Sequence, residues 1–384
     1  MKYNKIIKGI SKHIINSYNK KRDDRFWPSD YRIFISNPFN LAYGVSGVLY
    51  FLDEIGIDIQ KEYSKLLFSE KIDKFHLPPG LYIGLSGVAW VLLKFRYIKR
   101  AKKIICEANK SNLRFEISDI FYGEAGLGLT NLYFYLLLKD EKYLKEAIKC
   151  GEYIYKCKKK FKDTYYWSDN KKNNVYLGYA RGNSGIAIFM LYLFLLTKKK
   201  KYLLVGKKAL DFELLNKTII KRDSKETYSF GEYANVLRKE KNSIVYPYWK
   251  FGSSGVGLVL IRYYYYLKDD KYLKLAKKCA RDSMIDMAMF PSYFKGLAGI
   301  GDFLYDMYQY TNNKIYLNYC HDIAETIYLF RIENSNDEIA FPAEFLYRIS
   351  CDYGTGASGI GIFYNRLSTN TNRAFLLDPY IKVK

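Results

Sequence analysis

The stretch SYFKGLAGIG, from Ser292 to Gly301, contains the pattern on which the fold depends: two glycines three residues apart, followed by an apolar run. The same Gly-x-x-Gly unit recurs along the 384-residue chain, and an apolar segment follows it each time. The pairs are Gly44/Gly47, Gly84/Gly87, Gly123/Gly126, Gly182/Gly185, Gly252/Gly255, Gly296/Gly299 and Gly356/Gly359. Seven copies indicate a repeat protein, in which each unit buries its apolar face against its neighbours.

A tyrosine at a fixed offset marks a second part of the repeat. It lies 17 residues after the second glycine in four repeats, as Tyr143, Tyr202, Tyr272 and Tyr316. Each tyrosine opens a lysine-rich stretch whose apolar residues recur at helical spacing, as in a helix with one buried face. Each repeat therefore predicts an inner helix, apolar nearly all round, and a two-faced outer helix.

These repeats predict an all-α fold, an α/α toroid of seven inner and seven outer helices with Gly-x-x-Gly at the inner-helix starts. We expect a single domain, with residues 1–40 as a helical lead-in and 41–384 as the seven-repeat toroid. An open solenoid is disfavoured because the terminal inner helices are as apolar as the middle ones. Glycine at a helix start permits close packing and leaves N–H groups free, so converging helix N-termini would favour an anion.

The composition limits the classes of function. A formal net charge of +23 attracts anions, but no nucleic-acid recognition motif accompanies it, so we do not expect nucleic-acid binding. The first residues do not form a signal peptide, and the longest apolar run, 186–196, is about half a membrane span. We expect a cytoplasmic protein without a membrane span.

The cysteines do not indicate a metal or disulfide framework. Six are scattered along the chain and none forms a Cys-x-x-Cys pair, so we expect reduced, mostly buried thiols. Cys320, His321 and Asp322 are consecutive, but adjacent residues of a helix do not share a face. We do not expect this group to bind metal.

Several motifs together resemble the lanthionine synthetase C-like family, the cyclases that form thioether rings in ribosomal peptides. They are RDDRFWPSDYRIF, LPPGLYIGLSGVAWVLL, DIFYGEAGLGL, GYARGNSGIAI and FPAEFLYRISCDYGTGASGIGIF. The resemblance covers nearly the whole chain. It is closest to the zinc-independent cyclase domain of class III lanthipeptide synthetases.

Zinc-dependent relatives have a Cys two residues before the first glycine of repeat five, and a Cys-His pair just before that of repeat six. In this chain these positions are Lys250, Phe294 and Lys295. The family has a His one residue before the first glycine of repeat four, and here that residue is Arg181. The family also has an Asp four residues before the first glycine of repeat three, and Asp119 matches it. Because ammonium and phenyl groups are not zinc ligands, we expect no metal or other cofactor.

The resemblance implies addition of a peptide Cys thiol to dehydroalanine or dehydrobutyrine. The thiol must become thiolate, and the enolate that follows must be protonated at carbon. We expect positive potential from Lys250, Lys295, Arg181 and the helix N-termini to replace the metal. Asp119 and Asp352 are the candidate acid or base groups, followed by Tyr122.

Each candidate also has a structural interpretation. Asp119 would cap the third inner helix or pair with Arg181. Arg181 would bind a substrate carbonyl or pair with Asp352. The two lysines would be solvated rim residues, and Asp352 would anchor the last turn through Arg348.

Two classes of function remain open from the sequence. The first is a cyclase that forms lanthionine or labionin-type rings in a dehydrated, Cys-containing precursor peptide. The second is a non-catalytic toroid that holds a precursor peptide or a partner kinase or lyase. A toroid glycosidase is less favoured because it needs two suitably placed carboxylates. The chain lacks kinase motifs, so dehydration would require a separate enzyme or domain.

Overall fold

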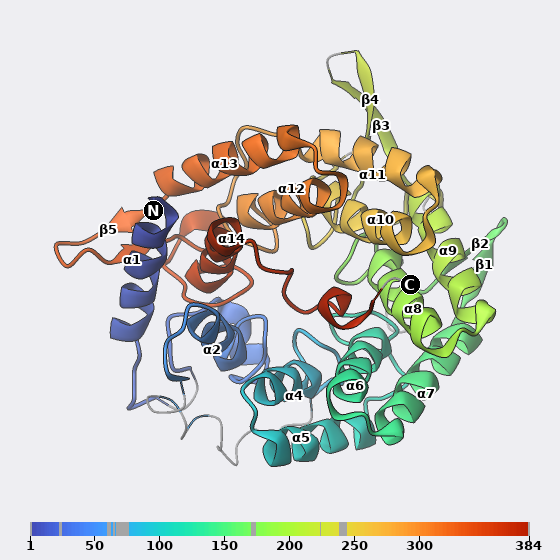
Figure 1. Ribbon diagram of the computed structural model, residues 1–384, viewed down its shortest axis with the longest axis horizontal. Helices are drawn as coiled ribbons and strands as arrows, with labels where there is room; N and C mark the ends of the chain where they lie inside the picture. The colour runs from blue at the N-terminus through green and yellow to red at the C-terminus, as the bar shows by residue number, and fades with distance from the viewer. Residues whose placement is uncertain are drawn as a thin grey trace.

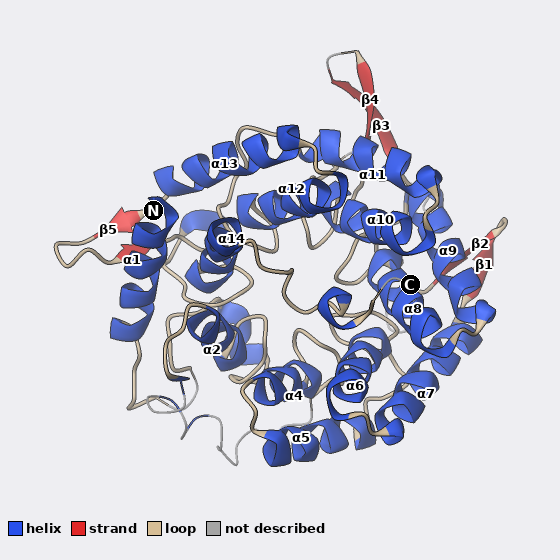
Figure 2. Cartoon of the chain, viewed as in Figure 1, coloured by secondary structure: helices blue, strands red, loops and turns tan. Residues whose placement is uncertain are grey.

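A computed structural model describes residues 2–22, 25–59, 63, 66, 77–169, 174–222, 224–237 and 244–382. The predicted fold is confirmed: the chain forms an α/α toroid, with an inner and an outer circle of helices (Figures 1 and 2). None of its described helices combines the length and apolar composition required to cross a bilayer.

Seven helices form the inner circle, and each begins at the residue after the first glycine of a Gly-x-x-Gly unit. They are α2 (Val45–Glu54), α4 (Leu85–Lys94), α6 (Glu124–Leu138), α8 (Asn183–Thr197), α10 (Ser253–Leu267), α12 (Leu297–Thr311) and α14 (Ala357–Thr369). The second glycine allows close packing because it has no side chain. At Gly299, for example, a Cβ atom would lie only 2.0 Å from the carbonyl oxygen of Tyr293, which leaves no room for another residue. Gly252 has φ of 122°, a conformation that favours glycine.

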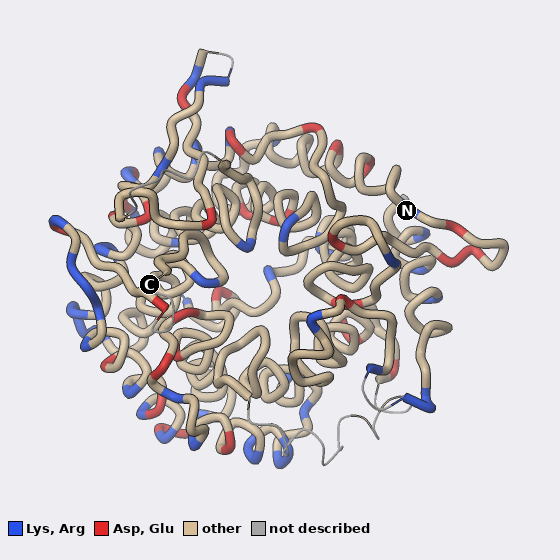
Figure 3. Tube along the Cα trace, turned by 180° about the vertical axis from the view of Figure 1, so that it is seen from behind, with Lys and Arg blue, Asp and Glu red and all other residues tan. Residues whose placement is uncertain are grey.

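The outer circle contains α1 (Lys2–Asn16), α5 (Ile98–Lys110), α7 (Glu141–Cys157), α9 (Lys200–Leu215), α11 (Asp270–Ser283) and α13 (Lys314–Leu329). Each of the four predicted tyrosines is the third residue of an outer helix and is buried. Helix α1, within the predicted lead-in, packs on α14 as its outer partner. The outer helix predicted between α2 and α4 lies largely outside the described residues. Lysines and arginines are numerous along this outer circle (Figure 3).

Three antiparallel hairpins lie in the three longest intervals between repeats. They are β1 (Lys159–Phe161) with β2 (Thr164–Tyr166), β3 (Thr218–Arg222) with β4 (Lys225–Ser229), and β5 (Ile332–Glu333) with β6 (Ile339–Ala340). Short 3-10 turns are η1 (Tyr31–Ile35), η3 (Asn235–Leu237), η4 (Glu344–Leu346) and η5 (Asp378–Tyr380). The differences in length between repeats are therefore taken up by hairpins outside the helices, and the inner circle stays regular.

The inner circle is closed, because each inner helix packs against the next and α14 packs against α2. Backbone hydrogen bonds of 2.8–3.2 Å also close it, between residues two positions before each first glycine. In this amide ring the N–H of each residue donates to the carbonyl of the next: Ala42, Tyr82, Phe121, Ala180, Lys250, Phe294, Gly354 and back to Ala42. The ring places seven equivalent loops at one end of the toroid.

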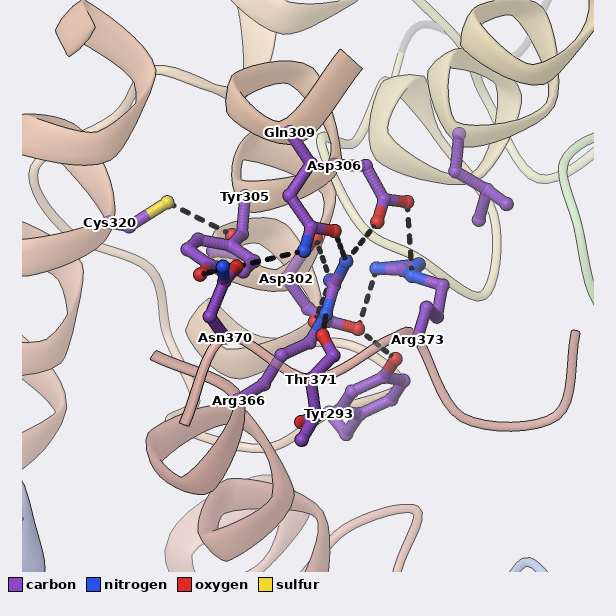
Figure 4. Close-up of polar contacts among 12 residues, drawn as sticks. Tyr293, Asp302, Tyr305, Asp306, Gln309, Cys320, Arg366, Asn370, Thr371 and Arg373 are labelled. Carbon is purple, nitrogen blue, oxygen red and sulfur yellow. Dashed lines mark hydrogen bonds and ion pairs between the residues drawn. The ribbon is translucent and has the colours of Figure 1, made fainter. Parts of the chain in front are cut away.

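The C-terminal segment crosses the other end of the ring (Figure 1). There, buried arginines and aspartates form a connected ionic cluster, part of which is shown in Figure 4. Its members are Arg262 of α10, Asp302 and Asp306 of α12, Arg366 of α14, and Arg373 and Asp378 of the C-terminal segment. Because this segment fills the end reached by the C-terminal halves of the inner helices, the glycine-rich loops form the end available for a site.

Candidate active site

The amide ring carries an aromatic floor at the centre of the toroid. The side chain of Tyr82 stacks on Phe121 with ring centroids 5.3 Å apart, and Phe294 meets both rings edge-on. Phe294 also stacks on Trp249, at 5.0 Å. Tyr82, Phe121 and Phe294 occupy ring positions in repeats two, three and six, and Trp249 directly precedes the ring residue of repeat five. The floor is therefore packed from distant parts of the sequence.

Lys250 lies on this floor. Its Nζ is 5.1 Å from the centroid of Phe121 and 5.9 Å from that of Phe294. Burial lowers the pKa of Lys250 to about 7, and the positive charges of Arg32 and Lys295 act in the same direction. The sequence predicted positive potential from this side chain, and an amine with this pKa is in addition available as a base near neutral pH.

The residues directly before the first glycines form a second circle around the floor. In it, Lys295 Nζ lies 5.4 Å from the ring of Phe251, and the Arg181 guanidinium lies 5.4 Å from the ring of Tyr122. Each of these pairs comes from two consecutive repeats. Lys295 is part-exposed, with 24% of its side chain accessible, so its ammonium group reaches the open end of the toroid.

Two residues that the sequence left unassigned complete the basic site. Arg32 donates to Glu344 across 2.8 Å, and the same carboxylate lies 3.7 Å from Lys295 Nζ. Asp30 holds the other side of the Arg32 guanidinium through two hydrogen bonds. Both segments, WPSDYRIF and FPAEFLYRIS, belong to the motifs of the resemblance, and that was the signal available in the sequence.

Glu344 occupies a strained turn. The two residues after it, Phe345 and Leu346, have φ of 65° and 59°, in the left-handed region that non-glycine residues seldom adopt. Oε1 of Glu344 is buried and accepts no hydrogen bond from a described residue, while Oε2 accepts a hydrogen bond from Arg32. The turn thus holds a buried negative charge beside three cationic side chains, and this charge limits their mutual repulsion.

Asp119 is buried, and its two oxygens contact different groups. Oδ1 accepts the N–H of Tyr122 at 2.7 Å, while Oδ2 lies 3.7 Å from Arg181 Nε. Burial raises the pKa of Asp119 to about 6, against the opposing effects of Arg181 and the backbone N–H groups. The predicted pair of Asp119 with Arg181 is therefore present, at ion-pair distance.

The turn made by Asp119 recurs at the equivalent position, four residues before the first glycine, in two other repeats. Asn40 accepts the N–H of Tyr43 at 2.8 Å, and Asp352 accepts that of Thr355 at 2.7 Å. This shared turn shapes the loop, so an Asp at this position has a local structural role in addition to any chemistry.

Asp352 is buried and contacts the backbone of Asp30, the residue that holds Arg32. It is fully buried, and its carboxylate accepts from the Thr355 hydroxyl, the Ser350 hydroxyl and the N–H of Asp30. Burial raises its pKa. These contacts give Asp352 the anchoring role, through partners other than the predicted Arg348, and it does not join Arg181 or the lysines.

A cavity of about 620 Å³ opens beside the basic site. Tyr122 and Arg181 belong to its lining, and each directly follows a residue of the amide ring, Phe121 or Ala180. Asp119 and Asp169 line the same cavity, and Asp169 lies 3.5 Å from Arg181. Aromatic rings connect it to Lys250: Nζ of Lys250 lies 5.1 Å from the centroid of Phe121, and that ring lies 5.1 Å from the ring of Tyr122 in the lining.

The predicted set of free N–H groups at the inner-helix starts is wrong. The first N–H of α2, α6, α10, α12 and α14 each donates to a carbonyl seven residues earlier in its own loop. In α8 a buried glutamate of the outer circle accepts the second N–H, because Glu213 accepts from Ser184 as well as from Gly178. These donors are used within the fold, so the positive potential of the site comes from its side chains.

The donor groups at the family's zinc positions do not fit that metal. Lys250 offers a single amine, Lys295 an ammonium group and Phe294 a ring, whereas zinc requires several N, S or O ligands on one centre. Within the described residues, His, Cys, Asp and Glu side chains do not gather in any group of three that suits a metal ion. Cys320 instead donates to the Gly301 carbonyl, while His321 bonds to Tyr3.

Comparison with known proteins agrees with this architecture. The sequence model of the lanthionine synthetase C-like protein family matches residues 96–380. The probable SapB synthase of Streptomyces coelicolor is 25% identical over 354 residues, which cover 89% of this chain and 36% of that protein. The chain therefore spans about a third of the length of this curated relative.

Solved structures share the toroid at low sequence identity. Nisin cyclase matches with a TM-score of 0.68 and 17% identity, covering 99% of this chain and 96% of that one. A Listeria innocua protein gives 0.58 at 13% identity, covering 97% and 99%. An α-1,6-mannanase of Salegentibacter gives 0.52 at 12%, covering 95% and 98%. These structures show the fold alone, and the match of the family model over residues 96–380 shows that the chain belongs to the lanthionine synthetase C-like family.

Proposed function

We propose that this chain is a zinc-independent lanthipeptide cyclase, which adds peptide Cys thiols to dehydroalanine or dehydrobutyrine and forms lanthionine or labionin-type thioether rings. The observation that carries the proposal is the position of Lys250. This side chain lies on the aromatic floor, at a family zinc-ligand position, and its pKa is lowered to about 7. A side chain able to take and return a proton thus occupies the place where relatives activate the thiol.

The reaction balances without a redox step. The neutral amine of Lys250 accepts the proton of the Cys S–H, and the thiolate attacks the β-carbon of the dehydro residue. The π electrons of the C=C bond move towards the adjacent carbonyl, which becomes an enolate. The Lys250 ammonium then returns the proton to the α-carbon, so a C–S and a C–H bond replace the S–H and π bonds.

The cations around Lys250 have two effects in this scheme. Lys295 and Arg32 disfavour its protonated form, and they stabilise the thiolate and the enolate oxygen. Glu344 holds Arg32 in place and lies beside Lys295. Asp119 and Arg181, in the adjoining cavity, would orient the peptide, and Asp119 is the alternative proton carrier. Asp352 has no part in the mechanism.

The proposed partners follow from this chemistry. The substrate is a precursor peptide that contains Cys and is already dehydrated at Ser or Thr. A kinase/lyase enzyme or domain must carry out the dehydration. We place the reaction in the cytoplasm and assign no nucleic-acid ligand and no metal cofactor.

The second candidate is a non-catalytic scaffold that holds a precursor peptide or a kinase or lyase partner. The loss of all three zinc-position ligands favours it, since scaffolds need no thiol activation. Incubating the purified chain with a chemically dehydrated Cys peptide separates the two. Ring closure leaves the peptide mass unchanged, so N-ethylmaleimide labelling followed by mass spectrometry measures the thiols that remain. Enzyme-dependent loss of labelling supports the cyclase, and binding without any such loss supports the scaffold.

A further inference from the structure

Arg32 has one nitrogen that the fold leaves unused. Its Nε donates to Asp30 Oδ1 at 2.6 Å, and its Nη2 donates to Asp30 Oδ2 at 2.9 Å and to Glu344 Oε2 at 2.8 Å. Nη1 donates to no residue in the part of the chain that the structure describes. Because the two carboxylates fix the plane of the guanidinium, the N–H bonds of Nη1 have a set direction.

Tyr43 supplies a second unused donor beside this nitrogen. The Arg32 guanidinium lies 4.7 Å from the centroid of the Tyr43 ring. The Tyr43 hydroxyl makes no hydrogen bond with the described residues, although only 2% of Tyr43 is exposed. Burial raises the pKa of Tyr43 well above its ordinary value, while the charge of Arg32 acts in the opposite direction. Tyr43 is thus a neutral phenol at pH 7, with an O–H bond available to donate.

These two donors belong to the basic site. Tyr43 meets Phe294 edge-on, with ring centroids 6.1 Å apart, and Lys250 Nζ lies 5.9 Å from the centroid of the same Phe294 ring. The charges of Arg32 and Glu344 act on the ionisation of both Tyr43 and Lys250. Neither donor atom is among the buried polar atoms of the described chain that lack a partner, so both are accessible to a ligand.

We propose that the Tyr43 hydroxyl and Arg32 Nη1 form an oxyanion subsite, which binds the carbonyl oxygen of the dehydro residue and stabilises the enolate formed from it. The subsite rests on the proposed function for the identity of this substrate. When the thiolate adds to the β-carbon, the C=C π electrons form a new double bond to the carbonyl carbon, and the carbonyl π electrons move onto oxygen. Lys250 still carries the proton from sulfur to the α-carbon, so neither donor loses a proton.

The subsite favours the transition state over the bound substrate. A hydrogen bond to a charged oxygen is stronger than one to a neutral carbonyl, so both donors bind the oxygen more tightly as its negative charge develops. The donors are also held in place before the reaction, Arg32 by its two carboxylates and Tyr43 by its packing on Phe294.

The kinetic test is Tyr43→Phe, which removes the hydroxyl and keeps the ring beneath Arg32. We expect kcat for ring closure to fall about 100-fold with little change in KM, as for loss of an oxyanion donor. The rise in rate near pH 7 should remain, because a neutral phenol does not change the charge around Lys250. Tyr31→Phe is the matched control and should keep the parent kcat, since the Tyr31 ring lies 5.6 Å from the same guanidinium but is 56% exposed.

Binding tests the subsite without ring closure. The probes are N-acetyl-dehydroalanine, whose carboxylate carries negative charge where the enolate oxygen develops, and its neutral amide. Ligand-observed NMR should show that the parent and Tyr31→Phe bind the acid more tightly than the amide. Tyr43→Phe should weaken binding of the acid about tenfold more than binding of the amide.

Two results would overturn the proposal. One is a kcat for Tyr43→Phe equal to that of Tyr31→Phe. The other is an equal loss of affinity for the acid and the amide, which would give the hydroxyl a role in packing alone. Far-UV circular dichroism and thermal melting establish that each variant is folded. A chain that closes no rings but shows the selective loss for the acid would refute the cyclase and retain the oxyanion subsite.

Discussion

The N–H of Gly354, in the last repeat, donates a 2.8 Å hydrogen bond to the carbonyl of Ala42, in the first. This bond completes the amide ring and brings the ends of the repeat array together. It also explains why Lys250, Phe294 and Lys295 share one site, because the ring sets their order whatever the length of the loops between repeats. The hairpins between repeats extend outwards and leave the order unchanged.

Replacing Lys250 with methionine should remove the base and leave the floor packed. We expect Lys250→Met to reduce kcat/KM for ring closure by at least about 100-fold at pH 7, as for loss of a general base. The parent rate should rise as the pH passes about 7, where Lys250 loses its proton. The variant should instead rise near pH 8.5, as free thiols ionise. A pH–rate profile by maleimide labelling checks this, and an unchanged profile would remove Lys250 from the mechanism.

Lys295→Met should alter the pH dependence as well as the rate. The charge of Lys295 lowers the pKa of Lys250, so its removal should move the rising limb to higher pH. Ring closure should slow at pH 7 and recover partly towards pH 9, and the double variant with Lys250→Met should be slower than either single one. Lys274→Met, on the exposed face of α11, is the matched control. Equal pH profiles for the parent, Lys295→Met and Lys274→Met would show that Lys295 is a bystander.

Zinc should be neither bound nor required. The groups at the family's ligand positions are one amine with a lowered pKa, one ammonium group and a phenyl ring, whereas zinc requires several N, S or O ligands on one centre. Elemental analysis of protein purified without chelators should find well under one zinc per chain, and EDTA should leave the ring-closure rate unchanged. One tightly bound zinc per chain, lost together with activity, would contradict the proposed mechanism.

The buried ionic cluster should be important for stability. Arg373 lies 2.7 Å from Asp302 and 3.1 Å from Asp306, with 2% of its side chain exposed. Arg373→Met leaves these carboxylates with fewer partners and should lower the free energy of unfolding by about 3–5 kcal/mol. Urea denaturation followed by circular dichroism measures the change. Arg331→Met removes an exposed pair with Glu333 and should change the free energy of unfolding far less than Arg373→Met does. Similar losses in both variants would refute the special role of the cluster.

Glu213 should make stability depend on pH. Burial raises its folded-state pKa from 4.5 to about 8, so the folded chain retains a proton that the unfolded chain releases. Its stabilising contribution is complete below pH 4.5 and is lost as the pH rises through about 8. Glu213→Gln keeps an acceptor for Gly178 and Ser184 but does not titrate. The parent should therefore lose roughly 1–3 kcal/mol relative to this variant between pH 5 and 8. Glu141→Gln, exposed on α7, is the control, and parallel pH curves for parent and Glu213→Gln would contradict the assignment.

The sequence alone determined the repeat, the two helix types and the chemistry at the family's zinc positions. These properties are local: glycine at a fixed spacing, apolar residues at helical periodicity and a buried tyrosine at the third position of outer helices are all visible within one repeat. They predicted the closed toroid, and a pair between Asp119 and Arg181 was one of the alternatives that the sequence left open. The identities of Lys250 and Lys295 also indicated a basic site.

The tertiary structure decided which groups meet and how they are charged. Arg32 and Glu344 come from opposite ends of the chain and join the site only after the ring closes. Asp352 carries the same local turn as Asp119, yet it is fully buried and its carboxylate is used by Ser350, Thr355 and Asp30. The loops also use N–H groups at the helix starts. Lys250 has its low pKa because folding removes it from water beside two other cations. Burial and proximity between distant repeats depend on the whole ring, and no segment of the sequence contains that information by itself.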